Sequence, residues 1–166
     1  FQKRRLTVRA KNRRGPLLKG AKIEVSKEGA TNSTIYLNNN DLILSKIGVP
    51  HKIAVAAVKE GQQILASGNL YSIEIDEKKA DPYYLRAFFE SERGSAILKS
   101  ITHGVAIQTI AADDLKNIRI PLLPMEEQKR IVRKYCAEMD EIAILKREIA
   151  RTEERLHGVF DEECEE

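Results

Sequence analysis

The chain has 166 residues, of which 42% are hydrophobic and 32% charged, and its formal net charge is +3. This length accommodates one domain with a hydrophobic core plus one extended element, and the composition excludes a disordered chain. No apolar run approaches the roughly 18 residues that a membrane-spanning helix requires, so we expect no membrane partner.

The small net charge conceals a strong asymmetry along the chain. Residues 1–22 contain nine basic side chains and no acidic one. These are Lys3, Arg4, Arg5, Arg9, Lys11, Arg13, Arg14, Lys19 and Lys22. From Met125 onward, eight basic residues face thirteen acidic ones. This gradient favours one end that binds a polyanion and another that is solvated or faces protein. The charge alone is equally compatible with a basic arm that has no specific partner.

The cysteines and histidines predict no metal site and no cofactor. Cys136 and Cys164 are separated by 27 residues without a second ligand at a suitable spacing, so we interpret them as free thiols. The histidines are equally scattered, at His51, His103 and His157. The chain starts at Phe1 and the next residues form no apolar signal core, which indicates a piece of a longer, cytoplasmic protein.

The middle of the chain predicts a small antiparallel sheet. Short apolar segments rich in β-branched residues are separated by polar or glycine-containing turns. These segments are residues 35–37, 42–45, 53–58, 63–66 and 70–75. In the last of them Tyr71, Ile73 and Ile75 alternate with other residues, which is the period of a strand with one buried face. We therefore expect an α+β fold whose small mixed or antiparallel sheet is accompanied by a few helices.

Helix signals begin at residue 81. Asp81 followed by Pro82 predicts a helix start, with aspartate as the cap and proline in the first helical position. Gly94 predicts a stop or kink in this helix. Further along, we expect a short strand over 105–110, a one-turn element over 113–115 and an extended segment over 118–120.

A long helix is predicted from Met125 to about residue 160. Apolar residues recur at two heptad positions over about four heptads, interrupted at Glu138 and Thr152. The predicted helix interface consists of Ile131, Tyr135, Ile142, Leu145, Ile149 and Leu156. The charged remaining faces favour a coiled coil with a partner segment; the alternative is a helix folded back into the core. From Met125 to Leu156 such a helix would be roughly 50 Å long.

Two short motifs suggest catalysis only at first sight. The segment 81–84, Asp-Pro-Tyr-Tyr, resembles the signature with which amino-methyltransferases position a flipped adenine, but Tyr83 replaces its second proline. The segment 76–78, Asp-Glu-Lys, resembles the metal-binding triplet of nucleases, but no Pro-Asp partner precedes it. We therefore interpret the two motifs as a helix start and a polar turn, and we predict no catalytic residue.

The order of motifs over residues 34–158 resembles the specificity subunits of type I restriction-modification systems. Ile120-Pro121-Leu122-Leu123-Pro124, followed by Glu127-Gln128 and Ile131 at the start of the heptad helix, is the most specific match. Preceding matches, in chain order, are Tyr84-Leu85, Gly94, Gly104 and Gln108-Thr109-Ile110. Residues 40–48 are similar to the family's Gly-Asp-Ile-Leu strand and turn, with Asn40 where glycine is common.

This resemblance implies a non-catalytic subunit that recognises DNA. Family members carry two target-recognition domains separated by two long antiparallel helices, which set the spacing of a split DNA site, and methyltransferase subunits dock on this frame. We expect a recognition domain over 1–124, incomplete at its N-terminal end, a spacer helix over 125–160 and an acidic tail over 161–166. Expected partners are double-stranded DNA, a methyltransferase subunit, and a second recognition domain or a second copy held through the long helix.

Under this hypothesis, basic residues bind phosphates and loop side chains read base edges, with turns 45–48 and 67–69 as candidate readers. The predicted DNA-binding residues are Arg9, Lys11, Arg13, Arg14, Lys19, Lys46 and Asn69. Two alternatives stay open. The chain could be the C-terminal recognition part of a single-chain methyltransferase-endonuclease whose catalytic motifs precede Phe1. It could also be a coiled-coil adaptor without a nucleic-acid role.

Overall fold

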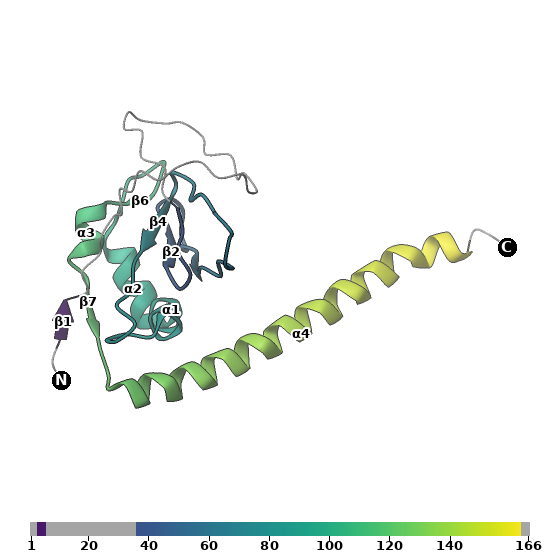
Figure 1. Cartoon of the computed structure of the whole chain (residues 1–166). Coiled ribbons are helices and arrows are strands. Elements are labelled where there is room, and N and C mark those ends of the chain that lie inside the picture. The colour runs from purple at the N-terminus through teal and green to yellow at the C-terminus, as the bar shows by residue number, and fades with distance from the viewer. Residues whose placement is uncertain (1–2, 6–35, 164–166) are drawn as a thin grey trace. The chain divides into compact units, whose positions relative to one another are not determined.

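The structure is a computed structural model that describes residues 3–5 and 36–163 (Figure 1). The chain divides into two compact units, Phe1–Lys129 and Arg130–Glu166, and each is described by itself. We call the first unit the sheet domain. The predicted DNA-binding residues between positions 9 and 19 lie outside the described residues.

A three-stranded antiparallel sheet forms the centre of the sheet domain (Figure 1). Strand β2 (Leu42–Ser45) lies between β3 (Ile53–Val55) and β4 (Leu70–Ile73). Alternate residues of β2, Leu42 and Leu44, are buried, as the period of a strand with one core face requires. The prediction of a small antiparallel sheet is therefore confirmed. The strands predicted over 35–37 and 63–66 are absent as such, and a single bridge between Tyr36 and Leu65 stands in their place.

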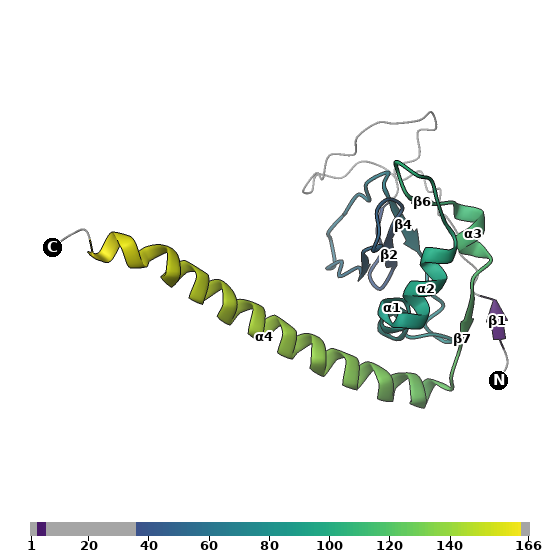
Figure 2. The same cartoon turned by 180° about the vertical axis from the view of Figure 1, so that it is seen from behind.

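Two consecutive helices, α1 (Pro82–Glu90) and α2 (Glu92–Ser100), pack against each other, and α1 also packs against β2 and β3 (Figures 1 and 2). The predicted helix start is confirmed: Asp81 caps α1, and its Oδ1 accepts a hydrogen bond from the Tyr83 N–H at 2.8 Å. Leu85 and Phe89 on α1 are buried in the core. Aspartate and proline therefore set where the helix starts, and the apolar face sets what it covers.

The prediction of a stop or kink at Gly94 was wrong. The break lies at Ser91, which ends α1 and caps α2 by accepting a hydrogen bond from the Gly94 N–H at 3.2 Å. Gly94 is buried within the first turn of α2. A Cβ atom at this position would lie 2.0 Å from the Phe88 carbonyl oxygen, closer than any van der Waals contact. The glycine is therefore required by the close approach of the two helices.

The rest of the sheet domain consists of two short strand pairs and a one-turn helix. Strand β5 (Thr102–His103) pairs with β6 (Thr109–Ile110), and β7 (Arg119–Pro121) pairs with β1 (Lys3–Arg5). Between β6 and β7 lies α3 (Ala112–Lys116), so the predicted one-turn element and extended segment are both confirmed. The strand predicted over 105–110 was too long, because residues 104–108 form the loop between β5 and β6.

Asn40 adopts the left-handed backbone conformation, with φ of 66°. Glycine and asparagine tolerate this region best, so asparagine can occupy this turn position. The next residue, Asp41, is buried and accepts hydrogen bonds from the Asn38 N–H at 2.9 Å and the Ser72 hydroxyl at 2.8 Å. The turn before β2 is therefore closed by local polar contacts.

The last helix, α4 (Met125–Glu163), begins where it was predicted to begin. It continues three residues past the expected end near residue 160, into the segment expected to be an acidic tail. At 39 residues it is roughly 58 Å long. The α+β fold with a long C-terminal helix is confirmed. No helix in the described part of the chain is both long and apolar enough to cross a membrane.

Candidate functional site

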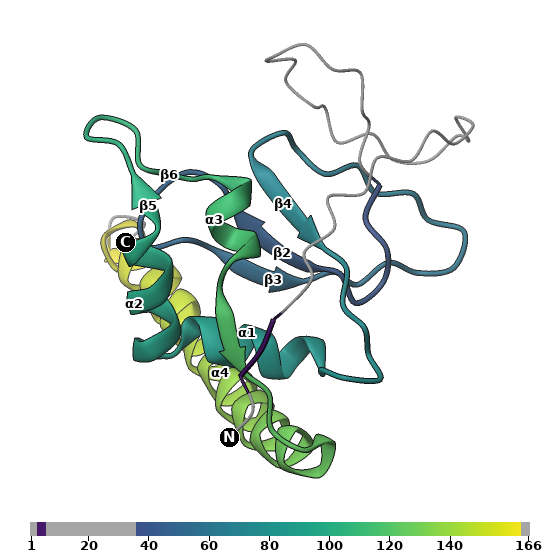
Figure 3. The ribbon, with the colours of Figure 1, turned by 90° about the vertical axis from the view of Figure 1, so that its left-hand side faces the viewer.

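Three loops meet at one end of the β3-β2-β4 sheet, and we call them together the three-loop surface. They are residues 46–50, 67–69 and 104–108. Backbone hydrogen bonds join them: Lys46 N–H to Asn69 O at 2.8 Å, Ile110 N–H to Lys46 O at 3.0 Å, and Gly48 N–H to Gln108 O at 3.0 Å. Figure 3 shows the loop between β5 and β6 projecting from the sheet domain. Segments distant in the sequence thus form one continuous surface.

Lys46 and Asn69, two of the predicted DNA-binding residues, lie together on this surface. The Lys46 ammonium donates a hydrogen bond to the Gly68 carbonyl oxygen at 2.6 Å and lies 4.8 Å from the centroid of the Tyr71 ring. A cation over an aromatic face is held by electrostatic attraction, so the charge is positioned before any ligand binds. Asn69 is exposed in the adjoining turn, where its N–H donates to the Ser67 hydroxyl at 3.3 Å.

Tyr71 connects β4 to β6 beneath the lysine. Its hydroxyl donates a hydrogen bond to the Ile110 carbonyl oxygen at 2.8 Å. Burial raises the pKa of this phenol, and the negative charges of Asp113 and Asp114 raise the pKa further. At neutral pH the phenol therefore keeps its proton and serves as a donor, which holds the loop 104–108 against the central sheet.

His51 anchors the first loop to the segment that follows α2. Its Nδ1 lies 3.0 Å from the Ser45 carbonyl oxygen, and its Nε2 lies 3.0 Å from the Thr102 hydroxyl. The Thr102 hydroxyl in turn donates to the Leu98 carbonyl oxygen at 2.7 Å. His51 therefore has a structural role in this surface. Among the described residues, no three His, Cys, Asp or Glu side chains gather in a way that could hold a metal ion.

Four aliphatic side chains on two of these loops are exposed, and we call them the apolar loop patch. They are Ile47, Val49, Val105 and Ile107. Sequence reasoning missed this feature because the last two were assigned to a strand, in which alternate residues would be buried. A usable signal was present: an uncharged run follows Gly104, and a glycine at a strand end often marks a tight turn.

Sequence reasoning also missed the role of Gln128, although this residue belongs to the Glu-Gln motif at the start of α4. Its side chain is fully buried at 0% exposure. The amide oxygen accepts a hydrogen bond from the Asp81 N–H at 2.9 Å, and the amide nitrogen donates to Lys79 O at 3.1 Å and Leu123 O at 2.8 Å. This one side chain ties the first turn of α4 to the cap of α1.

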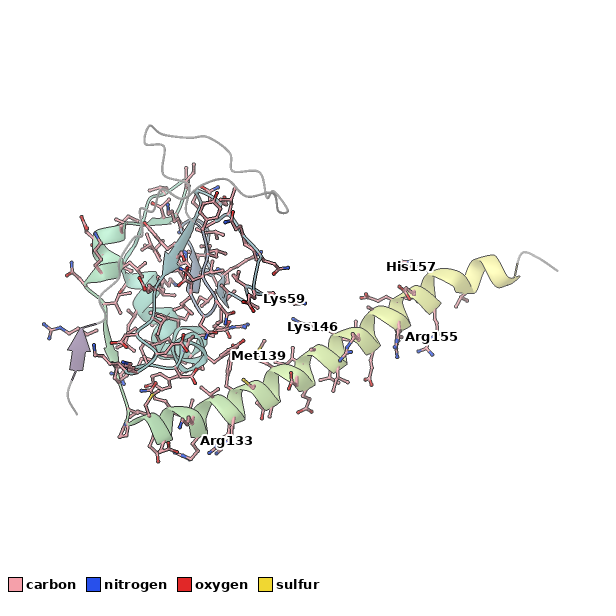
Figure 4. All side chains as sticks on the ribbon, in the orientation of Figure 1. Lys59, Arg133, Met139, Lys146, Arg155 and His157 are labelled. Carbon is pink, nitrogen blue, oxygen red and sulfur yellow. The ribbon has the colours of Figure 1, made fainter. Side chains whose placement is uncertain are left out.

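The heptad residues of α4 form an apolar stripe that is open to solvent along most of its length. Exposure rises from 43% at Ile142 through 50% at Leu145 and 57% at Ile149 to 70% at Leu156. The other two predicted interface residues, Ile131 and Tyr135, are partly buried. Charged groups occupy other faces of the helix: Arg133 and Arg155 project from one side in Figure 4, and Lys146 projects from the opposite side.

The chain thus combines a small α+β domain, in which three loops cluster at one sheet end, with a long helix that carries an exposed apolar stripe. The chain belongs to the type I restriction modification DNA specificity domain family, whose profile matches residues 9–154. The resemblance seen in the motifs is thereby confirmed. The match begins upstream of residue 34 and includes the basic segment with Arg9, Lys11, Arg13, Arg14 and Lys19.

Two relatives from Methanocaldococcus jannaschii are similar to this chain. The specificity subunit of the type I restriction enzyme MjaVIII is 32% identical over 103 residues, which are 62% of this chain and 23% of that protein. A second protein, named as the specificity subunit of the type I restriction enzyme MjaX, is 32% identical over 96 residues, covering 56% of this chain and 23% of its own length. The chain therefore matches about a quarter of either relative.

Proposed function

We propose that this chain provides sequence-specific DNA recognition within a type I restriction-modification specificity subunit, and that it directs methyltransferase and restriction subunits to a split DNA site. The observation that carries the proposal is the family match over residues 9–154. Both relatives are named as specificity subunits, which supports this function over a fused methyltransferase-endonuclease or a coiled-coil adaptor. In this proposal the chain itself is non-catalytic and requires no cofactor.

Residues 1–124 of the sheet domain would form the recognition domain and bind DNA through the basic N-terminal segment and the three-loop surface. Lys46 is held by Gly68 and Tyr71 in a defined position, so its charge can meet a phosphate with little loss of side-chain entropy. Asn69 is exposed beside it and presents the side-chain type that pairs with adenine in the major groove. Arg9, Lys11, Arg13, Arg14 and Lys19 would add phosphate contacts.

Salt should weaken binding of this chain to duplex DNA steeply, because each phosphate contact releases counterions. We expect Lys46→Ala to lower the slope of log K against log salt by about 1, and Arg13→Gln with Arg14→Gln to lower it by about 2 together. Fluorescence anisotropy with a labelled duplex, measured at several salt concentrations, gives the slope for each variant.

Lys59→Ala is the matched control for the salt experiment. Lys59 is exposed and follows Val58, whose N–H donates to the Asn39 side chain before β2, at the end of the sheet opposite to Lys46. This substitution should leave the slope unchanged. Equal slopes for wild type, Lys46→Ala and the arginine double variant would contradict the proposed binding surface.

The stripe on α4 would pair the recognition domain with a second helix, supplied by another recognition domain or by a second copy of the chain, and would set the distance between half-sites. Burying a leucine or isoleucine side chain contributes about 1.5–3 kcal/mol, so the exposed positions Ile142, Leu145, Ile149 and Leu156 represent a substantial driving force. A methyltransferase subunit would dock on the resulting frame.

In isolation, the chain should self-associate through this stripe. Ile142→Asp combined with Ile149→Asp should shift the mass measured by sedimentation equilibrium to that of the monomer, because each aspartate places a charge in the apolar seam. Ile144→Asp is the control: Ile144 is 49% exposed on the same helix but lies off both heptad positions. A double variant with the wild-type mass would rule out pairing through the stripe.

A further inference from the structure

The apolar loop patch is exposed to an unusual degree for aliphatic side chains. Val105 is 103% exposed and Ile107 64%, and Ile47 and Val49 are exposed to 44% and 45%. Single exposed aliphatic residues are ordinary on a protein surface. These four lie on two loops that are joined by the hydrogen bond from Gly48 N–H to Gln108 O at 3.0 Å, so they form one group.

The loop that carries Val105 and Ile107 is held firmly at its base. Gly104 turns the chain with φ of 103°, and a Cβ atom there would lie 2.2 Å from the Ile107 carbonyl oxygen. Strand pairing of β5 with β6 and a bridge between Ile47 and Thr109 fix both ends of the loop. A loop held in this way presents its apolar tip without an ordering cost on binding.

The charges around the patch favour a polyanion as its partner. Lys46 lies next to Ile47, Lys52 is exposed in the same turn, and Lys99 lines a pocket of about 180 Å³ together with Val49. The neighbouring carboxylates have cationic or histidine partners within α3 and β5: Asp113 contacts the Lys116 ammonium at 2.9 Å, and Asp114 lies 3.1 Å from His103 Nε2. Glu90 lines the same pocket as Lys99 and pairs with Arg86 at 3.0 Å. An apolar patch flanked by lysines fits nucleic acid better than a purely apolar protein face.

We propose that Val105 and Ile107 enter the major groove and contact the C5-methyl groups of thymines, so that they help to determine the recognised half-site. This inference rests on the proposed function. Thymine is the base that presents a methyl group in the major groove, and apolar side chains distinguish it from cytosine by that group. The groove is about 12 Å wide and admits a narrow loop, while Lys46 reaches the adjacent phosphates.

The test uses the protein in complex with its methyltransferase subunit. The bound half-site is first selected from a pool of random duplexes. Each thymine in it is then replaced by deoxyuridine, which removes only the methyl group. In the wild-type complex we expect one or two replacements to weaken binding about three- to tenfold, the size of effect that one buried methyl group gives. Val105→Ser and Ile107→Ser, which remove the aliphatic side-chain groups, should weaken binding to the thymine site similarly.

The decisive readout is the combination of both changes. Each deoxyuridine replacement that weakens wild-type binding should make no further difference in the variant, Val105→Ser or Ile107→Ser, that lacks the contacting side chain, because the methyl contact is already lost. The control is Val58→Ser, the same kind of substitution at a partly buried site at the opposite end of the sheet; it should retain full sensitivity to deoxyuridine.

Three results would overturn the inference while leaving DNA recognition intact. They are a half-site without thymine, insensitivity of the wild-type complex to every deoxyuridine, and persistence of that sensitivity in both loop variants. Loss of methyltransferase capture by the loop variants, with DNA binding unchanged, would also overturn it and would assign the patch to a protein partner. Failure to select any duplex would instead reject the proposed function, and this inference with it.

Discussion

Gly94→Ala is expected to destabilise the sheet domain by about 3 kcal/mol or more, at the upper end of what overpacking costs. The new Cβ atom would lie 2.0 Å from Phe88 O and 2.6 Å from Phe89 Cα. Both are backbone atoms, so no side chain can move aside and α1 must separate from α2. Urea unfolding followed by tyrosine fluorescence measures the effect, because Tyr84 is buried on α1.

Gly158→Ala is the matched control for this experiment. Gly158 also lies within a helix, but a Cβ atom there meets nothing within 4 Å. Alanine should therefore stabilise α4 slightly, by about 0.5–1 kcal/mol, through its higher helix propensity. If both variants unfolded at the wild-type urea concentration, the two helices would not approach each other as closely as described.

Gln128→Ala should cost about 2–4 kcal/mol, because a buried polar group that loses its partner costs about 1–3 kcal/mol. The substitution removes the acceptor of the Asp81 N–H and the donor to Lys79 O and Leu123 O, the three backbone groups that the fully buried Gln128 amide contacts. The same urea titration measures the loss. Gln62→Ala is the control, since Gln62 is exposed and its side chain accepts a hydrogen bond from the nearby Lys59 N–H.

Gln128→Glu keeps the size of the side chain but changes its hydrogen bonding, so it separates the contribution of the hydrogen bonds to stability from that of packing. The glutamate would face two carbonyl oxygens while buried, so the pKa of its carboxyl should rise above the ordinary value of about 4.3. A raised pKa in the folded state means that stability is lost as pH rises above the unfolded value. The free energy of unfolding of the variant should therefore lie far below that of wild type at neutral pH, and the difference should shrink as the pH falls towards about 4. A pH-independent deficit would refute the hydrogen-bonding role.

Local sequence signals predicted the elements whose ends depend on neighbouring residues. Asp81 and Pro82 define the start of α1 because the cap and the fixed φ of proline act within one turn. The heptad repeat defines α4 because each apolar residue reports the same helix face. Gly94 misled the prediction for the opposite reason: a glycine required by helix contact has the same appearance in sequence as one that ends a helix.

The candidate site was predicted in part. Lys46 and Asn69 were identified as DNA-binding candidates from their turns, and they stay predictions, but their contact across the sheet depends on the register of β2 with β4. The role of Gln128 depends on partners 47 and 49 residues away, at Asp81 and Lys79. No local pattern encodes contacts of that separation, so a polar residue in a helix start could not be distinguished from a solvated one.

The sequence by itself determined the α+β class, the start of the long helix, its apolar stripe and the family. Periodicity and capping depend on residues close together in the chain, and the order of motifs can be read along it. The tertiary structure alone decided which loops share one surface, why Gly94 must be glycine, and that Val105 and Ile107 lie in a loop instead of a strand. Those properties follow from strand register and helix packing, in which residues far apart in the chain set each other's environment.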